Sequence, residues 1–109
     1  MPMAGIVIND ALFLDIKADL DITWEDEATN RKVKNYIAQG MFFINDKLGK
    51  PGDYSKEGYP RTLLFEYVRY ARDKALDVFE ANYKSMILAM QNDRKVSAYA
   101  EKNAISPGQ

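Results

Sequence analysis

The chain has 109 residues and a formal net charge of −1, a length that fits one domain and a charge balance typical of globular proteins. It contains no cysteine and no histidine, which excludes disulfides, zinc sites built from these residues, thiolate nucleophiles and imidazole bases. No apolar run approaches the ~20 residues of a membrane helix, and residues 1–8 lack the basic start of a signal peptide, so we expect a protein that is not exported.

Charge is distributed unevenly along the sequence. Residues 1–30 contain seven acidic side chains and one lysine, whereas residues 31–109 contain fourteen basic and nine acidic side chains. Such a distribution can serve solubility alone. It also suits head-to-tail packing of identical subunits, in which the acidic surface of one subunit contacts basic positions of the next, such as Arg31, Lys32 or Arg69.

The first predicted helix follows a capping residue, Asn9 or Asp10, and carries Leu12, Ile16 and Leu20 on one face. It ends near residue 21, where the apolar spacing is interrupted.

The second predicted helix begins after the variant capping box at residues 23–26 and ends at Gly49, a residue well suited to a helix C-terminus. Gly40 lies on its inner face, where the missing side chain lets another helix approach closely. Phe42 lies nearly opposite that face and is either an ordinary exposed aromatic residue or a contact between subunits. Residues 50–60 follow as a long, turn-rich loop and a candidate contact element. The inner face consists of Val33, Ile37, Met41, Ile44 and Leu48.

The run from residue 61 to residue 106 contains neither glycine nor proline, and its first thirty residues keep one helical period. Because Pro60 suits the first turn of a helix, the sequence predicts one continuous helix over about residues 60–92, with at most one kink near residues 80–83. The apolar stripe consists of Leu64, Val68, Ala71, Ala75, Phe79, Asn82, Met86 and Met90.

The predicted long helix is apolar over roughly twice the arc of an ordinary surface helix. Either the chain's own shorter helices cover the excess, or one flank contacts another copy or another protein. The candidate contact residues on that flank are Tyr67, Tyr70 and Lys74, together with Phe42. Arg72 also falls within the apolar arc. Either its stem packs there with the charge in water, or it pairs with an acid from the first two helices or from a neighbour.

The helical pattern decays after Lys95. We therefore expect an all-α fold, a small bundle of three or four helices over residues 1–95 in a single domain, followed by a flexible tail over residues 96–109.

The sequence contains no phosphate loop, metal motif or cofactor motif. Asp15 with Asp19, and Asp73 with Asp77, have the i,i+4 spacing that could hold a divalent ion, but such carboxylates usually form a solvated helix face. Tyrosines interleaved with Arg69 could stack on nucleic acid, but acids on the same helix and a pI of about 5.4 argue against a DNA-binding surface. We therefore expect no cofactor, no metal and no catalytic residues.

Two stretches resemble the head–tail connector proteins of long-tailed bacteriophages, also described as adaptor, head-completion or DNA-packaging proteins. Residues 59–85, with Tyr-Val-Arg-Tyr-Ala-Arg at residues 67–72, resemble the long helix of that family. Residues 21–27 and 36–49 resemble the family's second helix and its end. The resemblance covers about residues 10–92 and consists of aromatic and aliphatic spacing, with no catalytic signature.

The resemblance implies a structural protein of virion assembly that adds a ring beneath the portal of a filled capsid. Its implied location is the head–tail interface of the virion, and the host cytoplasm during assembly. The implied partners are further copies of the chain, twelve on the portal, then the portal protein and a stopper or tail-completion protein. DNA would pass through the ring without sequence-specific binding, and no membrane would be involved. The alternatives are a small helical DNA-binding or regulatory protein and an enzyme that uses carboxylates.

Overall fold

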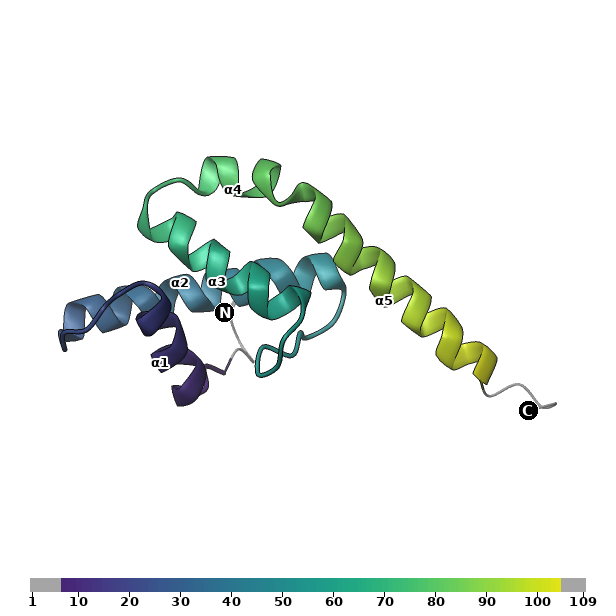
Figure 1. The fold of residues 1–109 in the computed structure, drawn as a ribbon, viewed down its shortest axis with the longest axis horizontal. Coiled ribbons are helices and arrows are strands. Elements are labelled where there is room, and N and C mark those ends of the chain that lie inside the picture. The colour runs from purple at the N-terminus through teal and green to yellow at the C-terminus, as the bar shows by residue number, and fades with distance from the viewer. Residues whose placement is uncertain (1–6, 105–109) are drawn as a thin grey trace.

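The computed structural model describes the backbone of residues 7–104 and the side chains of residues 7–97. Within that range the chain forms five α-helices and no strand (Figure 1), which confirms the predicted all-α class and corrects the predicted number of helices. The helices are α1 (Asp10–Asp19), α2 (Glu27–Leu48), α3 (Tyr59–Arg72), α4 (Leu76–Asn82) and α5 (Lys84–Ala104).

Side-chain caps fix the starts of the first two helices. The Asn9 side chain accepts hydrogen bonds from the backbone N–H groups of Ala11 and Leu12, so Asn9, and not Asp10, is the cap of α1 among the two predicted candidates. Asp26 caps α2 by accepting from the backbone N–H and the hydroxyl of Thr29, and these bonds hold the pKa of Asp26 below its usual value. The capping box predicted over residues 23–26 is therefore replaced by a single aspartate at its last position.

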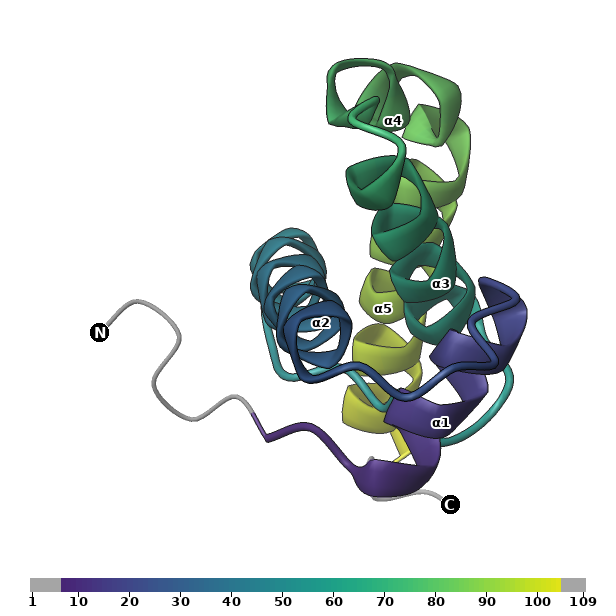
Figure 2. The same cartoon turned by 90° about the vertical axis from the view of Figure 1, so that its left-hand side faces the viewer.

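The close approach predicted at Gly40 is confirmed by the packing of α2 against α3. A Cβ atom built on Gly40 would lie 2.8 Å from Leu64 Cδ1 and 2.9 Å from Tyr67 Cδ1, so no larger residue fits unless these side chains shift. Figure 2 looks roughly along α2 and shows α3 and α5 alongside it. The large side chains that are fully buried are Ile16, Val33, Ile37, Ile44, Leu63, Leu64, Val68 and Phe79.

The predicted continuous helix over residues 60–92 is wrong, because α3 ends at Arg72 and α4 begins at Leu76. Lys74 adopts a left-handed conformation with φ of 61°. Its N–H donates to the Ala71 carbonyl at 3.1 Å, and the Ala75 N–H donates to the Tyr70 carbonyl at 2.8 Å. These two bonds form a Schellman turn, which usually has glycine at the left-handed position.

The same type of turn ends α1, with Asp21 as the left-handed residue at φ of 60°. The Asp21 N–H donates to the Ala18 carbonyl at 3.0 Å and the Ile22 N–H donates to the Lys17 carbonyl at 2.9 Å. The turn places Ile22 in the core, where its side chain is buried.

A second, milder interruption separates α4 from α5 at Tyr83, whose φ of −112° and ψ of 15° depart from helical values. This position lies inside the window predicted for a kink, residues 80–83.

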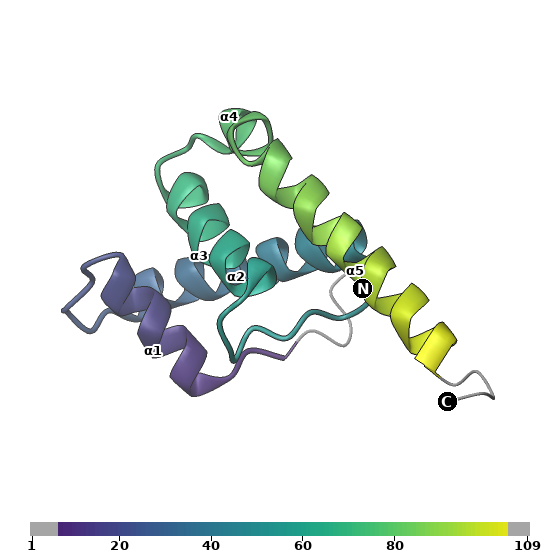
Figure 3. The ribbon, with the colours of Figure 1, turned by 45° about the vertical axis from the view of Figure 1, so that its right-hand side comes forward.

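The end of α5 projects from the bundle, as Figures 1 and 3 show. Ile87 and Met90 are buried against the other helices, whereas residues 92, 93 and 95–97 are exposed. The tail predicted over residues 96–109 is helical as far as Ala104, and residues 105–109 lie outside the described residues.

Candidate partner interface

Phe79 of α4 is the centre of an aromatic cluster that also contains Phe43, Tyr67, Tyr70 and Tyr83. Its ring centroid lies 5.4 Å from that of Tyr67, 5.6 Å from Tyr70 and 5.2 Å from Tyr83. Phe43 of α2 completes the cluster at 6.0 Å, and Phe79 itself is only 2 % exposed. Mostly edge-to-face arrangements at these distances are favourable for aromatic rings.

Polar contacts fix the edges of the aromatic cluster. Asn82 Nδ2 donates to the Tyr70 hydroxyl at 3.1 Å, and the Tyr83 hydroxyl donates to Glu66 Oε1 at 3.0 Å. Burial, together with the neighbouring Glu66 carboxylate, raises the pKa of Tyr83 to about 12. Burial alone raises the pKa of Tyr67. The Tyr83 hydroxyl therefore acts as a neutral hydrogen-bond donor near neutral pH.

The flank of α3 predicted to contact a partner is thus covered in large part by α4 of the same chain. Tyr67 and Tyr70 are half-buried, and the turn at Lys74 brings Phe79 back against both. This arrangement corresponds to the alternative in which the chain covers its own excess apolar arc. Participation of the two tyrosine edges in a contact with another subunit stays a prediction.

Arg72 and Lys74 lie at the α3–α4 turn, and both are exposed. Arg72 was expected within the apolar arc of a continuous helix, but α3 ends at this residue and the arc does not extend past it. Lys74 occupies the left-handed position of the turn. Neither residue is therefore buried, and a role for either one in a contact stays a prediction.

Phe42 is exposed on α2, as its position opposite the inner face predicts, with 47 % of its surface accessible. The projecting helix α5 adds Leu88 and Val96, which are 54 % and 56 % exposed and lie eight residues apart on one side of it. The remaining large apolar side chains exposed among residues 7–97 are Val7, Leu14, Trp24, Tyr59, Leu76 and Val78.

Ion pairs between α1 and α3 account for most of the acidic side chains of α1. Arg61 Nη2 lies 3.0 Å from Asp15 Oδ2, and Arg69 pairs with Asp19 and, at 3.8 Å, with Glu66 of its own helix. Arg69 is therefore not the free cation that the charge distribution assigned to a neighbouring subunit. The i,i+4 carboxylates of α1 hold two arginines of α3, and among the described residues no group of three potential ligands could hold a metal ion.

Lys17 is a buried lysine in α1 that sequence reasoning did not select. Its side chain is 6 % exposed, its Nζ atom lies 3.2 Å from Glu25 Oε2, and it stands 5.3 Å from the centroid of the Phe13 ring. A hydrogen bond from Asn30, followed by the contact with Lys17, lowers the pKa of Glu25. The available signal in the sequence is its spacing: Lys17 lies four residues after Phe13 and three before Leu20, which places it on the same face of the helix as these apolar residues.

The loop between α2 and α3, a predicted contact element, is held by Tyr54. The Tyr54 hydroxyl donates to Asn45 Oδ1 at 2.6 Å, and the same oxygen accepts from the Gly52 N–H at 2.8 Å. Arg61 Nη1 donates to the Tyr54 carbonyl at 2.9 Å. Burial raises the pKa of Tyr54 well above its usual value.

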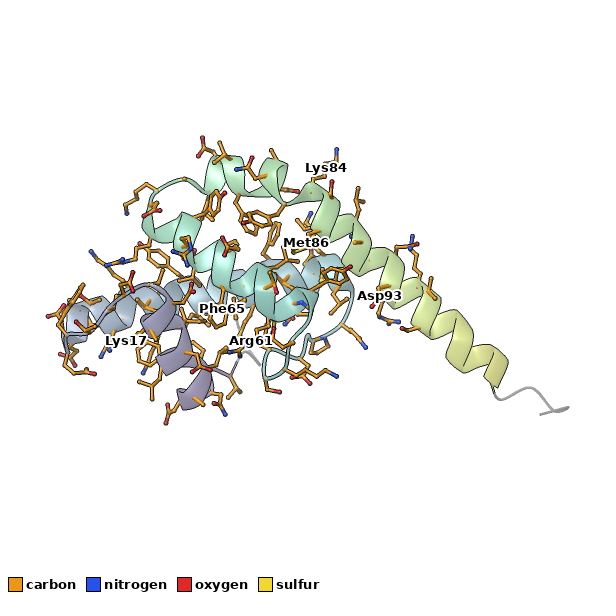
Figure 4. All side chains as sticks on the ribbon, viewed as in Figure 1. Lys17, Arg61, Phe65, Lys84, Met86 and Asp93 are labelled. Atoms are coloured by element: carbon orange, nitrogen blue, oxygen red, sulfur yellow. The ribbon has the colours of Figure 1, made fainter. Side chains whose placement is uncertain are left out.

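A groove of about 710 Å³ separates this loop from α5. Met86 and Met90 contribute apolar surface, and Arg94, whose Nε atom is buried without a hydrogen-bond partner, lies beside them. Figure 4 shows Met86 and Asp93 on this part of α5. Three basic and three acidic residues line the groove, which gives it no net charge: Lys50, Lys56, Arg94, Asp53, Glu57 and Asp93.

No protein-family model, curated protein or solved structure matches this chain. None of the helices within residues 7–104 has the length and apolar character required to cross a bilayer.

Proposed function

We propose that the protein is a structural subunit of phage assembly, a head–tail connector. Copies of it form a ring under the portal, extend the DNA channel and dock the stopper or tail protein. The role is structural and involves no catalysis. The phage role and these partners are inferred from the resemblance of residues 10–92 to connector proteins.

The observation that carries the proposal is the exposure of large apolar side chains on the outer faces of α2 and α5. Phe42, Leu88 and Val96 each leave about half of their surface accessible. Exposed apolar surface on a projecting helix is typical of a chain that buries it against a partner. A small subunit of a ring needs two different surfaces of this kind, one for each neighbour.

Charge provides weaker support for head-to-tail contacts. Among the described residues, ion pairs join Asp15, Asp19 and Glu25 to bases of the same chain, whereas Asp21 and Glu27 have no such partner. Arg31 and Lys32 are exposed on α2 and are available to a neighbouring subunit. Contacts of this kind are weakened by salt, so ring formation without the portal is expected to be salt-sensitive.

The proposed mechanism is geometric. Free subunits with weak contacts stay monomeric or form rings of variable size. The portal then acts as a template, because its twelve equivalent docking sites raise the local concentration of subunits and fix the ring at twelve.

Mass measurement tests this proposal directly. The protein is measured alone over a salt series and then with purified portal, and portal-dependent rings that resist salt better than free assemblies are expected. Phe42→Glu should weaken ring formation, whereas Gln39→Glu, which adds the same charge at an exposed position of α2 without removing an apolar side chain, should not. A closed dimer under every condition, both with and without portal, would contradict the proposal that the protein is a connector.

One observation favours the second candidate, a small DNA-binding or regulatory protein. Three basic side chains, those of Arg31, Lys32 and Lys34, are exposed within one turn of α2. A DNA-binding role predicts binding to duplex DNA that falls steeply as salt rises, whereas the connector predicts no appreciable binding.

A further inference from the structure

The sequence of the connection between α3 and α4 favours a continuous helix, whereas the structure has a turn there. The helical period runs unbroken from Leu64 to Met90, and no glycine or proline occurs between residues 61 and 104. The turn nevertheless requires Lys74, a residue with a Cβ atom, to adopt a left-handed conformation that such residues disfavour. A sequence that favours a straight helix therefore forms a bend at residues 73–75, which we call the hinge.

Few fully buried side chains hold the segment beyond the hinge in place, although hydrogen bonds from Asn82, Tyr83 and Gln91 also tie it to α2 and α3. Within α4 only Phe79 is buried, and every other residue of that helix is exposed. The first half of α5 adds two buried side chains, Ile87 and Met90, which pack against α2 and α3. These contacts require a surface formed by α2 and α3, but they do not require that it belong to the same chain.

We propose that α4 and α5 exchange between copies of the protein, so that the surface of α2 and α3 that binds them is also a binding site for a second copy. Straightening of the hinge would carry Phe79, Ile87 and Met90 away from their own bundle and onto that of a neighbour. An exchanged element remakes its contacts in the partner, so only the hinge changes conformation. The occupant is a second copy because its α4 and α5 are identical to the segment already seated there.

The hinge residue determines the balance between the two forms. Glycine at position 74 favours the bend, since it adopts the left-handed conformation readily and is unfavourable inside a helix. Valine at this position disfavours the bend, since a β-branched residue is poorly tolerated there. Valine in place of glycine at one hinge should shift the equilibrium between the bent and the straight form towards the straight form by about tenfold. Because an exchanged dimer contains two straight hinges, valine should favour that dimer over two bent monomers by about a hundredfold relative to glycine.

The test compares Lys74→Val with Lys74→Gly after refolding from denaturant at high and low protein concentration. Light scattering reports the oligomeric state, and the valine variant is expected to form oligomers that the glycine variant does not. Lys95→Val is the matched control, since it adds the same side chain at an exposed position of α5, away from the hinge.

A distance measurement distinguishes exchange from any other association. Thr62 and Asp93 are exposed and line the same groove, and the chain has no native cysteine, so a pair of spin labels can be placed at these two positions. In the bent chain the two labels are close. With the hinge straightened the labels move far apart, and the 31 residues between them set an upper limit of about 45 Å for one continuous helix. Dilution of labelled Lys74→Val into an excess of unlabelled protein ensures that only distances within one chain are observed.

The proposal predicts oligomers of Lys74→Val in which the distance within one chain is long. Monomers with a short distance, or oligomers that keep the short distance, would overturn it. The inference does not depend on the proposed function: a failure to form rings on the portal leaves it intact, and short distances within one chain of Lys74→Val refute it whether or not rings form.

Discussion

The bundle formed by α1, α2 and α3 differs from the segment formed by α4 and α5 in how thoroughly each is buried. Ile37, Ile44, Leu63 and Leu64 in the bundle are all fully buried. In α4 and α5 Phe79 is the one fully buried large side chain among the described residues, and the last turns of α5 project away from the other helices in Figures 1 and 3. Stability is therefore concentrated in the first region, and the second region opens at a lower free energy.

The strongest test of this difference compares Ile37→Ala with Phe79→Ala. Each truncation should cost about 3 kcal/mol through lost burial and the cavity that remains. Ile37→Ala should lower the free energy of global unfolding, whereas Phe79→Ala should mainly release α4 and α5. Hydrogen exchange of the amides of α2 separates the two outcomes. Equal loss of protection in α2 for both variants would show that the two regions unfold as one unit.

Gly40→Val tests the packing between α2 and α3 within the stable region. The new side chain would overlap Leu64 and Tyr67, which lie against the glycine, and we expect a loss of about 2 kcal/mol in the free energy of unfolding. Urea denaturation gives this value. Gln39→Val serves as control, because that neighbouring position is exposed and has space for the side chain.

The turns with Asp21 and Lys74 in the left-handed conformation allow the two regions to be compared by substitutions that raise the free energy of unfolding. Lys74→Gly should raise the free energy of unfolding of the bent monomer by about 1 kcal/mol, because glycine removes the steric cost of the left-handed conformation. Asp21→Gly should raise it by about half as much, since aspartate tolerates this conformation better than lysine. Thermal unfolding at low protein concentration measures both. A larger gain at position 21 would contradict the assignment of the greater strain to the hinge.

The smallest expected effect concerns the cap of α2. Hydrogen bonds from Thr29 lower the pKa of Asp26 in the folded protein, so the stabilisation is present above the pKa of the unfolded chain, about 3.8, and is lost as pH falls through the folded value. Asp26→Asn keeps an oxygen acceptor without titrating, so its urea midpoint should depend less on acid pH than that of the native protein. Asp53→Asn is a suitable comparison, because Asp53 accepts similar bonds from Ser55 outside any helix.

Sequence reasoning succeeded where a local chemical signal sets the structure. Asn9 and Gly49 mark helix ends through their own side chain or lack of one, and Gly40 and Phe42 lie where the helical period places them. It failed at Lys74, because the bend buries Phe79 against rings on α2 and α3, a tertiary contact that no local residue preference signals. The candidate interface failed in the same way at Arg69, whose partner Asp19 is fifty residues away in the sequence.

The single tryptophan, Trp24, lies half-exposed in the acidic connection between α1 and α2, far along the chain from the tyrosines of the aromatic cluster. Trp24 therefore reports on the acidic end of the unmodified protein, whereas three of the seven tyrosines report on the aromatic cluster. Association through the acidic end would shift tryptophan emission to shorter wavelength and leave the tyrosine bands in the near-ultraviolet circular dichroism spectrum unchanged. Release of α4 and α5 would change the tyrosine bands and leave the tryptophan emission unchanged. Two optical signals from the native sequence are thus sufficient to order assembly and opening in time.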